Sequence, residues 1–201
     1  MTLIEPDRRL ARYLMGSLGP YAGRVRVSIA PFERAALSAG SFDLGVAATS
    51  FHWLPERLAL RKIARALRPG GWWATWNNHH GDPYRPSAFH RALQPLYREL
   101  SGGRVGREYT KTSAARDRRD RLRALESVGR FDDISREDVR WSVTLATAHV
   151  TALWGTFSDI VTLSPRRREW FLAELGRIAD EQFGGEVTFP MLTPVYSARR
   201  V

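Results

Sequence analysis

Apolar and polar residues recur along the chain with two different periods, and the change of period separates strands from helices. One run, residues 24–29, alternates apolar and polar residues, whereas residues 42–49 are mostly apolar and small, as in a strand buried on both faces. In residues 55–67 the apolar positions recur at helical spacing, which leaves the arginines and Lys62 on the outward face. The first half is predicted to contain strands at 2–5, 24–29, 42–49 and 72–76 and helices at 8–18 and 55–67.

The second half is predicted to be mainly helical. Asp7 and Gly19-Pro20 mark the start and stop of the helix at 8–18, and Pro69-Gly70-Gly71 ends the helix at 55–67. The last apolar segment, 186–198, holds two prolines, which predicts an edge or bulged strand. The later helices are predicted at 86–100, 114–128, 147–158 and 165–183, and the later strands at 139–145 and 186–198. Strands that alternate with helices favour an α/β fold with a parallel sheet.

Composition restricts the class of protein. The chain has 201 residues, 43% of them hydrophobic, which is enough for one compact domain. It has no cysteine, so disulfides and thiolate metal sites are excluded. No apolar run approaches the roughly 20 residues of a membrane span, and the first ten residues do not resemble a signal peptide. We therefore expect a cytoplasmic protein with no membrane partner.

The formal charge of +10 has two explanations. It could attract nucleic acid or acidic substrates. It could equally reflect a GC-rich genome, because all but two of the 31 basic residues are arginine. In the arginine-rich stretch 104–123, Asp117 and Asp120 favour a solvated, salt-bridged helix face, so nucleic acid is not the expected partner.

One block of sequence is more specific than the rest. Residues 41–78 read SFDLGVAATSFHWLPERLALRKIARALRPGGWWATWNN. An FD pair opens a strand of small residues, FHW follows it, and LRPGG separates a helix from the next strand. Upstream, IEPD at 4–7 ends an apolar run with acids, and downstream TPVY at 193–196 lies in the last strand.

This block closely resembles the fourth strand, next helix and fifth strand of class I S-adenosylmethionine-dependent methyltransferases of the type 11 and type 25 kind. Residues 4–7 are similar to the family's second strand, residues 30–43 to its adenine-side loop, and the C-terminal part to one subfamily. The resemblance implies a Rossmann-like sheet, mostly parallel with an antiparallel closing strand. It also implies transfer of a methyl group from S-adenosylmethionine to an unidentified small-molecule acceptor.

The resemblance suggests one methyltransferase-like domain over residues 1–201. Residues 1–80 would form the cofactor-side half, residues 81–130 a helical substrate region, and residues 131–201 the C-terminal strands and helices.

The cofactor-binding candidates follow strand ends, where ligands bind in open α/β sheets. Glu5 can accept hydrogen bonds from both ribose hydroxyls, although a solvated turn acid is the alternative. Phe32 can cover the adenine and Glu33 can accept from its amine; core packing and a helix-start acid are the alternatives. Thr49 and Ser50 can contact cofactor or substrate, or they can cap the strand end.

Two further groups have weaker claims to chemistry. His52 could be a general base if the acceptor must lose a proton, but a structural imidazole beside Trp53 that caps the next helix is favoured. Adjacent His79 and His80, with Asp82, have no further ligand at helical spacing, so no metal site is predicted.

One part of the family pattern is missing from residues 1–201. The family's first strand ends in a glycine-rich turn, and no glycine cluster here follows a strand and opens a helix. The sequence therefore predicts an N-terminally truncated sheet with a gap between strands 2–5 and 42–49. We expect re-pairing, a neighbouring copy of the chain or disorder of residues 1–30 to close the gap, since buried unpaired backbone is costly. A non-catalytic remnant that binds or interacts, and a nucleic-acid-binding module, remain alternative functions.

Overall fold

The computed structural model describes residues 1–85, 87–100 and 111–201, which form two compact units. The first unit comprises Met1–Trp76, Arg121–Arg136 and Tyr196–Val201. The second comprises Asn77–Asp120 and Glu137–Val195. Each unit has its own hydrophobic core.

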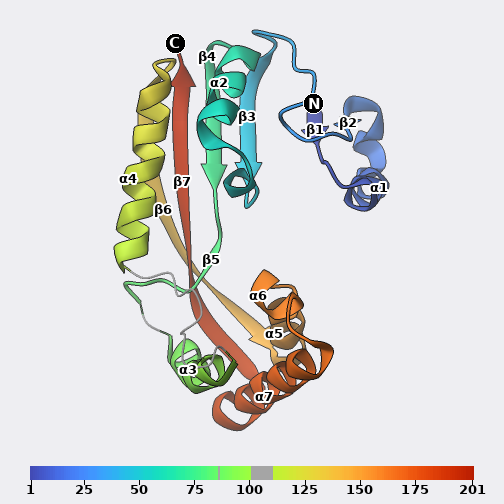
Figure 1. The fold of residues 1–201 in the computed structure, drawn as a ribbon, viewed down its shortest axis with the longest axis vertical. Helices are drawn as coiled ribbons and strands as arrows, with labels where there is room; N and C mark the ends of the chain where they lie inside the picture. Colours follow the sequence, from blue (N-terminus) through green and yellow to red (C-terminus); the bar gives the residue numbers. More distant parts are fainter. Residues whose placement is uncertain (86, 101–110) are drawn as a thin grey trace. The chain divides into compact units, whose positions relative to one another are not determined.

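Helices and strands alternate in the first part of the chain and helices dominate the second (Figure 1). Up to Trp76 the elements are β1 (Thr2–Ile4), α1 (Arg8–Ser17), η1 (Gly19–Arg24), β2 (Arg26–Ser28), β3 (Phe42–Ala48), η2 (Phe51–Trp53), α2 (Glu56–Ala66) and β4 (Leu67–Trp76). They are followed by β5 (His79–His80), α3 (Ala88–Leu100), α4 (Lys111–Val128), β6 (Phe131–Ala146), α5 (Thr147–Trp154), α6 (Ser158–Val161), α7 (Pro165–Phe183) and β7 (Glu186–Arg200).

The strands form two sheets. β1 and β2 make a parallel pair, and a five-stranded sheet has the order β3-β4-β7-β5, with β6 also paired to β7. β3 and β4 are parallel, whereas β5 and β7 are antiparallel, and Figure 1 shows β7 running opposite to β4. The α/β class and the antiparallel closing strand are confirmed, and the larger sheet is mixed.

The start of α1 follows from the residue that precedes it. Asp7 has an extended backbone, and its Oδ1 accepts hydrogen bonds from the backbone N–H groups of Arg9 and Leu10, at 2.7 and 3.0 Å. These bonds satisfy two of the N–H groups that a helix start leaves without a partner. The predicted N-cap is therefore confirmed.

The RPGG motif begins β4 rather than separating it from α2. The pairing of β3 with β4 is interrupted by a register shift between Phe42 and Leu44, opposite residues 68–71. A Cβ atom on Gly71 would lie 3.0–3.1 Å from the carbonyl oxygens of Arg68, Asp43 and Phe42, and Gly70 has a φ of +79°. The motif therefore lets two backbones approach at an irregular point of the sheet, which a side chain would prevent.

The core of the first unit lies on one face of β3 and β4. Leu60 and Ile63 of α2 pack with Trp73, and α4 adds Leu125. On the opposite face of β3, Leu44 and Val46 are 57% and 56% exposed. The prediction that residues 42–49 are buried on both sides is wrong, because helices of the described chain cover only one side of this strand.

The predicted gap between β1 and β3 is not closed within the chain. In the described residues β1 pairs only with β2 and β3 only with β4, so re-pairing is wrong. Residues 1–30 form β1, α1, η1 and β2, so disorder is wrong as well. Both expectations assumed that unpaired backbone groups would be buried, which is costly in free energy. The exposure of Leu44 and Val46 shows instead that water reaches β3 and can solvate its free edge.

β7 is an interior strand, which corrects the prediction of an edge strand. It pairs with β4, β5 and β6, although it contains Pro190 and Pro194. The ladder with β5 uses only Met191 and Leu192, which lie between the two prolines. Because β7 changes pairing partners along its length, its prolines can lie at positions where no backbone N–H is needed for pairing.

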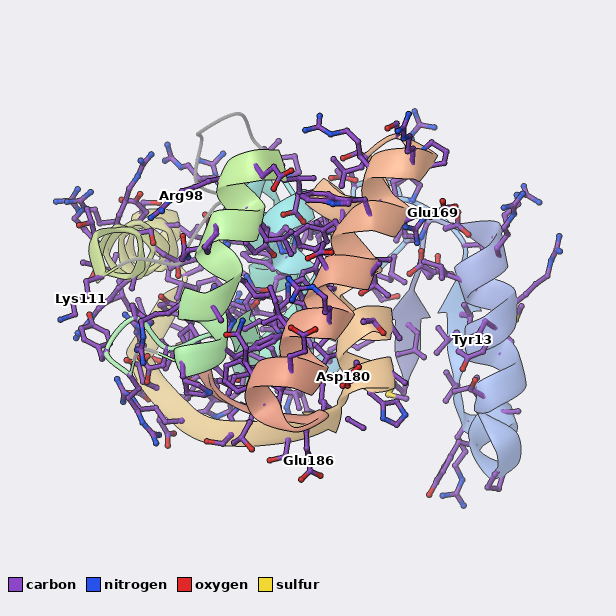
Figure 2. The ribbon with its side chains drawn as sticks, turned by 90° about the horizontal axis from the view of Figure 1, so that it is seen from below. Tyr13, Arg98, Lys111, Glu169, Asp180 and Glu186 are labelled. Atoms are coloured by element: carbon purple, nitrogen blue, oxygen red, sulfur yellow. The ribbon has the colours of Figure 1, made fainter. Side chains whose placement is uncertain are left out.

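The core of the second unit encloses two histidines among aromatic rings, whereas Lys111, Glu169 and Glu186 of the same unit lie on its outside (Figure 2). The His80 ring lies 4.9 Å from that of Phe157, and the His90 ring lies 5.5 Å from Phe189 and 6.1 Å from Trp154. His80 Nδ1 and His90 Nε2 are buried without a hydrogen-bond partner among the described residues. Burial lowers the pKa of His80, and burial together with His80 lowers the pKa of His90 to about 4.

The shifted His90 predicts a loss of stability in mild acid. An unfolded histidine binds a proton near pH 6.5, but folded His90 stays neutral to about pH 4, so acidification between these values favours the unfolded chain. The free energy of unfolding should fall by roughly 2 kcal/mol more between pH 7 and 4.5 in the wild type than in His90→Leu. Urea titrations at several pH values, followed by tryptophan fluorescence, measure the difference. His149→Gln, at an exposed histidine, is the control and should keep the wild-type slope; equal slopes for wild type and His90→Leu would contradict the assignment.

Candidate functional site

Glu5 lies at the carboxyl end of β1, as predicted. Its backbone N–H donates to the carbonyl of Ser28 at 3.1 Å, which extends the β1–β2 pairing by one residue. The side chain is half-buried, and its Oε1 accepts a hydrogen bond from the Asp7 N–H at 2.8 Å. The turn thus orients the carboxylate through one oxygen, and no hydrogen bond to a described residue occupies the other.

Phe32 and Glu33 lie in the turn after β2, and a lysine holds this turn in place. Lys62 Nζ donates to the carbonyl oxygens of Phe32, Glu33 and Ala35, at 2.6, 2.9 and 2.6 Å. The same ammonium group lies 5.1 Å from the centre of the Phe32 ring. The Phe32 ring is half-buried against the first core, and Glu33 is exposed.

Lys62 was missed as a site residue by the sequence reasoning, which placed it on the solvated face of its helix. The structure corrects this placement, because the side chain of Lys62 reaches the 31–35 turn from α2. A weak signal exists in the sequence: Lys62 is one of two lysines in a chain whose other 29 basic residues are arginine. A compact ammonium can meet three convergent carbonyl oxygens, whereas a planar guanidinium is suited to paired acceptors.

Thr49 and Ser50 follow β3 directly. The Thr49 N–H donates to the carbonyl of Trp76 at 2.8 Å, which ties the end of β3 to the end of β4. Thr49 has a φ of +50°, in the left-handed region that a β-branched residue rarely adopts. Both side chains are exposed, and neither hydroxyl caps an element in the described structure. Strained backbone of this kind is concentrated at ligand sites.

His52 lies in the short η2 turn and is exposed. Its ring is 4.9 Å from that of Trp53, which is itself 76% exposed. The predicted position of the His52 imidazole beside Trp53 is confirmed. The predicted cap of the next helix is wrong, because α2 begins after Pro55 without a side-chain cap. The buried anchor of the turn is Phe51, whose ring packs on Trp73 at 5.1 Å.

The structure thus arranges the predicted residues in two groups. Glu5 and the Phe32–Glu33 turn form the first group, because each follows the carboxyl end of one of the two paired strands β1 and β2. Thr49, Ser50 and His52 form a second group at the carboxyl end of β3, in the other sheet. The first group offers a carboxylate, an aromatic face and a second acid, which suit a ribose and an adenine. None of the described strand-to-helix turns is glycine-rich, so a backbone cradle for the methionine part is not among these residues.

The arginines of the described part of α4 are largely paired with acids. Arg116 and Arg119 lie 3.7 and 3.4 Å from Asp120, and Arg121 lies 2.9 Å from Glu56. The predicted salt-bridged face is confirmed for residues 111–123, while residues 104–110 lie outside the described residues. Asp82 is engaged by Arg140 at 3.1 Å, and the described residues contain no group of three ligands that could hold a metal ion. None of the helices that the structure describes is long and apolar enough to cross a membrane.

Residues 6–75 match the sequence model of the methyltransferase domain family. No curated protein matches the chain.

Solved structures show the same fold over the whole chain. A proposed type II methyltransferase from Anaeromyxobacter dehalogenans is similar with a TM-score of 0.64 and 18% identity, over 99% of this chain and 79% of that one. A proposed methyltransferase from Bacillus halodurans gives 0.52 and 14%, over 98% and 81% of the two chains. The YcgJ protein of Bacillus subtilis gives 0.52 and 15%, over 99% and 81%. The chain has the methyltransferase fold, and the resemblance to class I methyltransferases is confirmed.

The role of Lys62 can be tested without any ligand. Lys62→Met removes three hydrogen bonds from a charged donor, so the free energy of unfolding should fall by about 2 kcal/mol. Amide exchange in the 31–35 turn should accelerate more than exchange elsewhere. Arg61→Met removes a neighbouring, exposed charge and should change stability by less than about 0.5 kcal/mol. Equal effects of the two substitutions would contradict the role assigned to Lys62.

Proposed function

We propose that the protein transfers a methyl group from S-adenosylmethionine to a small-molecule acceptor, with residues 1–80 as the cofactor-side half of one methyltransferase domain. The observation that carries the proposal is the position of Glu5 at the carboxyl end of β1, where it pairs with Ser28 at the end of β2, shortly before the Phe32–Glu33 turn. The match of residues 6–75 to the methyltransferase domain model supports it independently.

The proposed roles follow the chemistry of each side chain. The free oxygen of Glu5 would accept hydrogen bonds from the ribose, Phe32 would cover one face of the adenine, and Glu33 would accept from its exocyclic amine. Thr49 and Ser50 would contact the cofactor or the acceptor through their exposed hydroxyls. S-adenosylmethionine, when bound, supplies an electrophilic methyl carbon, so positioning accounts for much of the rate.

His52 is the proposed general base for an acceptor that must lose a proton. The imidazole is exposed, so it can exchange a proton with solvent, and Trp53 limits its orientation. An acceptor that is already a free nucleophile would not need it. We further propose that the protein acts in the cytoplasm, which agrees with the absence of cysteine.

Cofactor binding tests the proposal directly. Calorimetry with S-adenosylhomocysteine should give a saturable heat, and Glu5→Gln should weaken binding about tenfold, because a charge-assisted contact to the ribose is lost. Glu126→Gln makes the same change at an exposed acid of the first unit and should bind as the wild type does.

The absence of heat at high ligand concentration would contradict the proposed function for this chain. It would favour the alternative of a methyltransferase-fold protein that binds or interacts without catalysis. Equal weakening by Glu5→Gln and Glu126→Gln would retain binding but contradict the role of Glu5.

We also propose that two copies of the chain pair through β3. The strand has a free edge and two exposed apolar side chains, and a two-fold axis would place two such edges in register. Light scattering after size exclusion should show a dimer for the wild type and a monomer for Leu44→Lys. Leu58→Lys, at a 61% exposed leucine of α2, is the matched control and should remain dimeric. A wild-type monomer at all concentrations would refute the pairing.

A further inference from the structure

The second unit contains a pocket that the cofactor proposal does not use. Its volume is about 290 Å³, and it lies where the start of α3 meets β6 and β7. All of its lining residues belong to the second unit. They are Arg85, Ser87, Ala88, Ser142, Thr188, Phe189 and Pro190.

The polar lining of this pocket consists of hydrogen-bond donors. It contains one guanidinium group, on Arg85, and three hydroxyl groups, on Ser87, Ser142 and Thr188, but no carboxylate. A guanidinium group can only donate, and a hydroxyl group can donate to whichever acceptor is present. Such a lining is complementary to an oxyanion and unsuited to a cation.

Arg85 has no acidic partner among the described residues. No carboxylate of the described residues lies in salt-bridge range of it, in contrast to Arg140, which pairs with Asp82 at 3.1 Å and Asp138 at 3.8 Å. Among the described residues, the exposed Arg85 therefore brings a positive charge without an acidic partner to the pocket. A fork of donors of this kind binds phosphate and carboxylate through two parallel hydrogen bonds.

The hydroxyl groups are held by regular structure. Ser142 and Thr144 lie two apart on β6 and so share a face, as do Thr188 and Pro190 on β7. The hydroxyl groups of Thr144 and Thr188 lie 2.7 Å apart across the two strands. Ser142 has no hydrogen bond to a described residue, so its hydroxyl is available to a ligand.

The N-terminus of α3 adds a positive electrostatic field at the pocket. Ser87 is only 8% exposed, and its Oγ accepts a hydrogen bond from the His90 N–H at 3.4 Å, which places it at the N-terminus of a 13-residue helix. Ser87 and Ala88 both line the pocket, so the positive end of the helix dipole faces it. Arg85 and the helix start thus favour the same charge of ligand.

We propose that this pocket binds a small oxyanion, the phosphate or carboxylate group of a small molecule. Its volume is just below the range of about 300–1,000 Å³ for ligand pockets, which suits one charged group rather than a whole cofactor. The inference rests on the second unit alone and holds whether or not the first unit binds S-adenosylmethionine.

Titration of the labelled protein with inorganic phosphate, and separately with acetate, tests the proposal. At constant ionic strength the amide resonances of Ser87, Ala88, Ser142 and Thr188 should shift in a saturable way. The anion that binds more tightly identifies the group, phosphoryl or carboxyl, and either result supports the pocket.

Three variants locate the binding. Arg85→Gln should raise the apparent Kd at least about fivefold, because it loses the charged donor. Ser142→Ala removes a hydroxyl without breaking an internal hydrogen bond and should weaken binding about twofold with an unchanged spectrum elsewhere. Arg166→Gln, at an exposed arginine of the same unit, is the control for net charge and should bind like the wild type.

Three results would overturn the proposal. The first is the absence of saturable shifts with either anion. The second is a Kd for Arg85→Gln equal to that of the wild type. The third is an equal loss in Arg85→Gln and Arg166→Gln, which would show general attraction to a basic surface.

Discussion

Backbone pairing along β7 is the interaction on which the larger sheet depends. This strand of 15 residues pairs with β4, β5 and β6, and β3 joins the sheet only through β4. Its side chains contribute to both cores: Val187, Phe189 and Met191 to one, and Tyr196 and Ala198 to the other. A single strand thus pairs with several neighbours and supplies apolar side chains to the core of each unit. Its apolar pattern therefore determines its interior position in the sheet, although it contains two prolines.

The two units have different chemistry. The first presents acids and an aromatic ring after strand ends. The ammonium group of Lys62 holds the Phe32–Glu33 turn through hydrogen bonds to three carbonyl oxygens. The second presents hydroxyl groups and a guanidinium group, which has no acidic partner among the described residues, beside a helix start. The first combination suits the hydroxyl groups and amine of a nucleoside, and the second suits an anion. The two proposed sites use different side chains, so their ligands would not compete.

The sequence was sufficient for features that depend on neighbours along the chain. The Asp7 cap, the helix from Pro165 to Phe183 and the small-residue strand were all predicted from local pattern. The sequence was insufficient where contacts between residues far apart along the chain determine the structure. Lys62 looked like one more solvated cation because its three acceptors are about 30 positions away, and β3 looked doubly buried because apolar composition does not reveal which faces have a covering helix. Of the candidate site, the order of strand ends was predictable, but the left-handed Thr49 was not, because its conformation is set by the bond to Trp76.

The free edge of β3 also affects the behaviour of the newly synthesised chain. Seven residues, FDLGVAA, present a free edge with one charged side chain, Asp43, which Arg68 partly neutralises at 2.8 Å. Natural edge strands usually carry lysine, proline or a bulge that discourages pairing with foreign strands. Here the only such device is the irregular step near Phe42, at the start of the strand. A newly synthesised chain exposes this free edge until the edge pairs, and an unpaired strand edge of this kind favours aggregation.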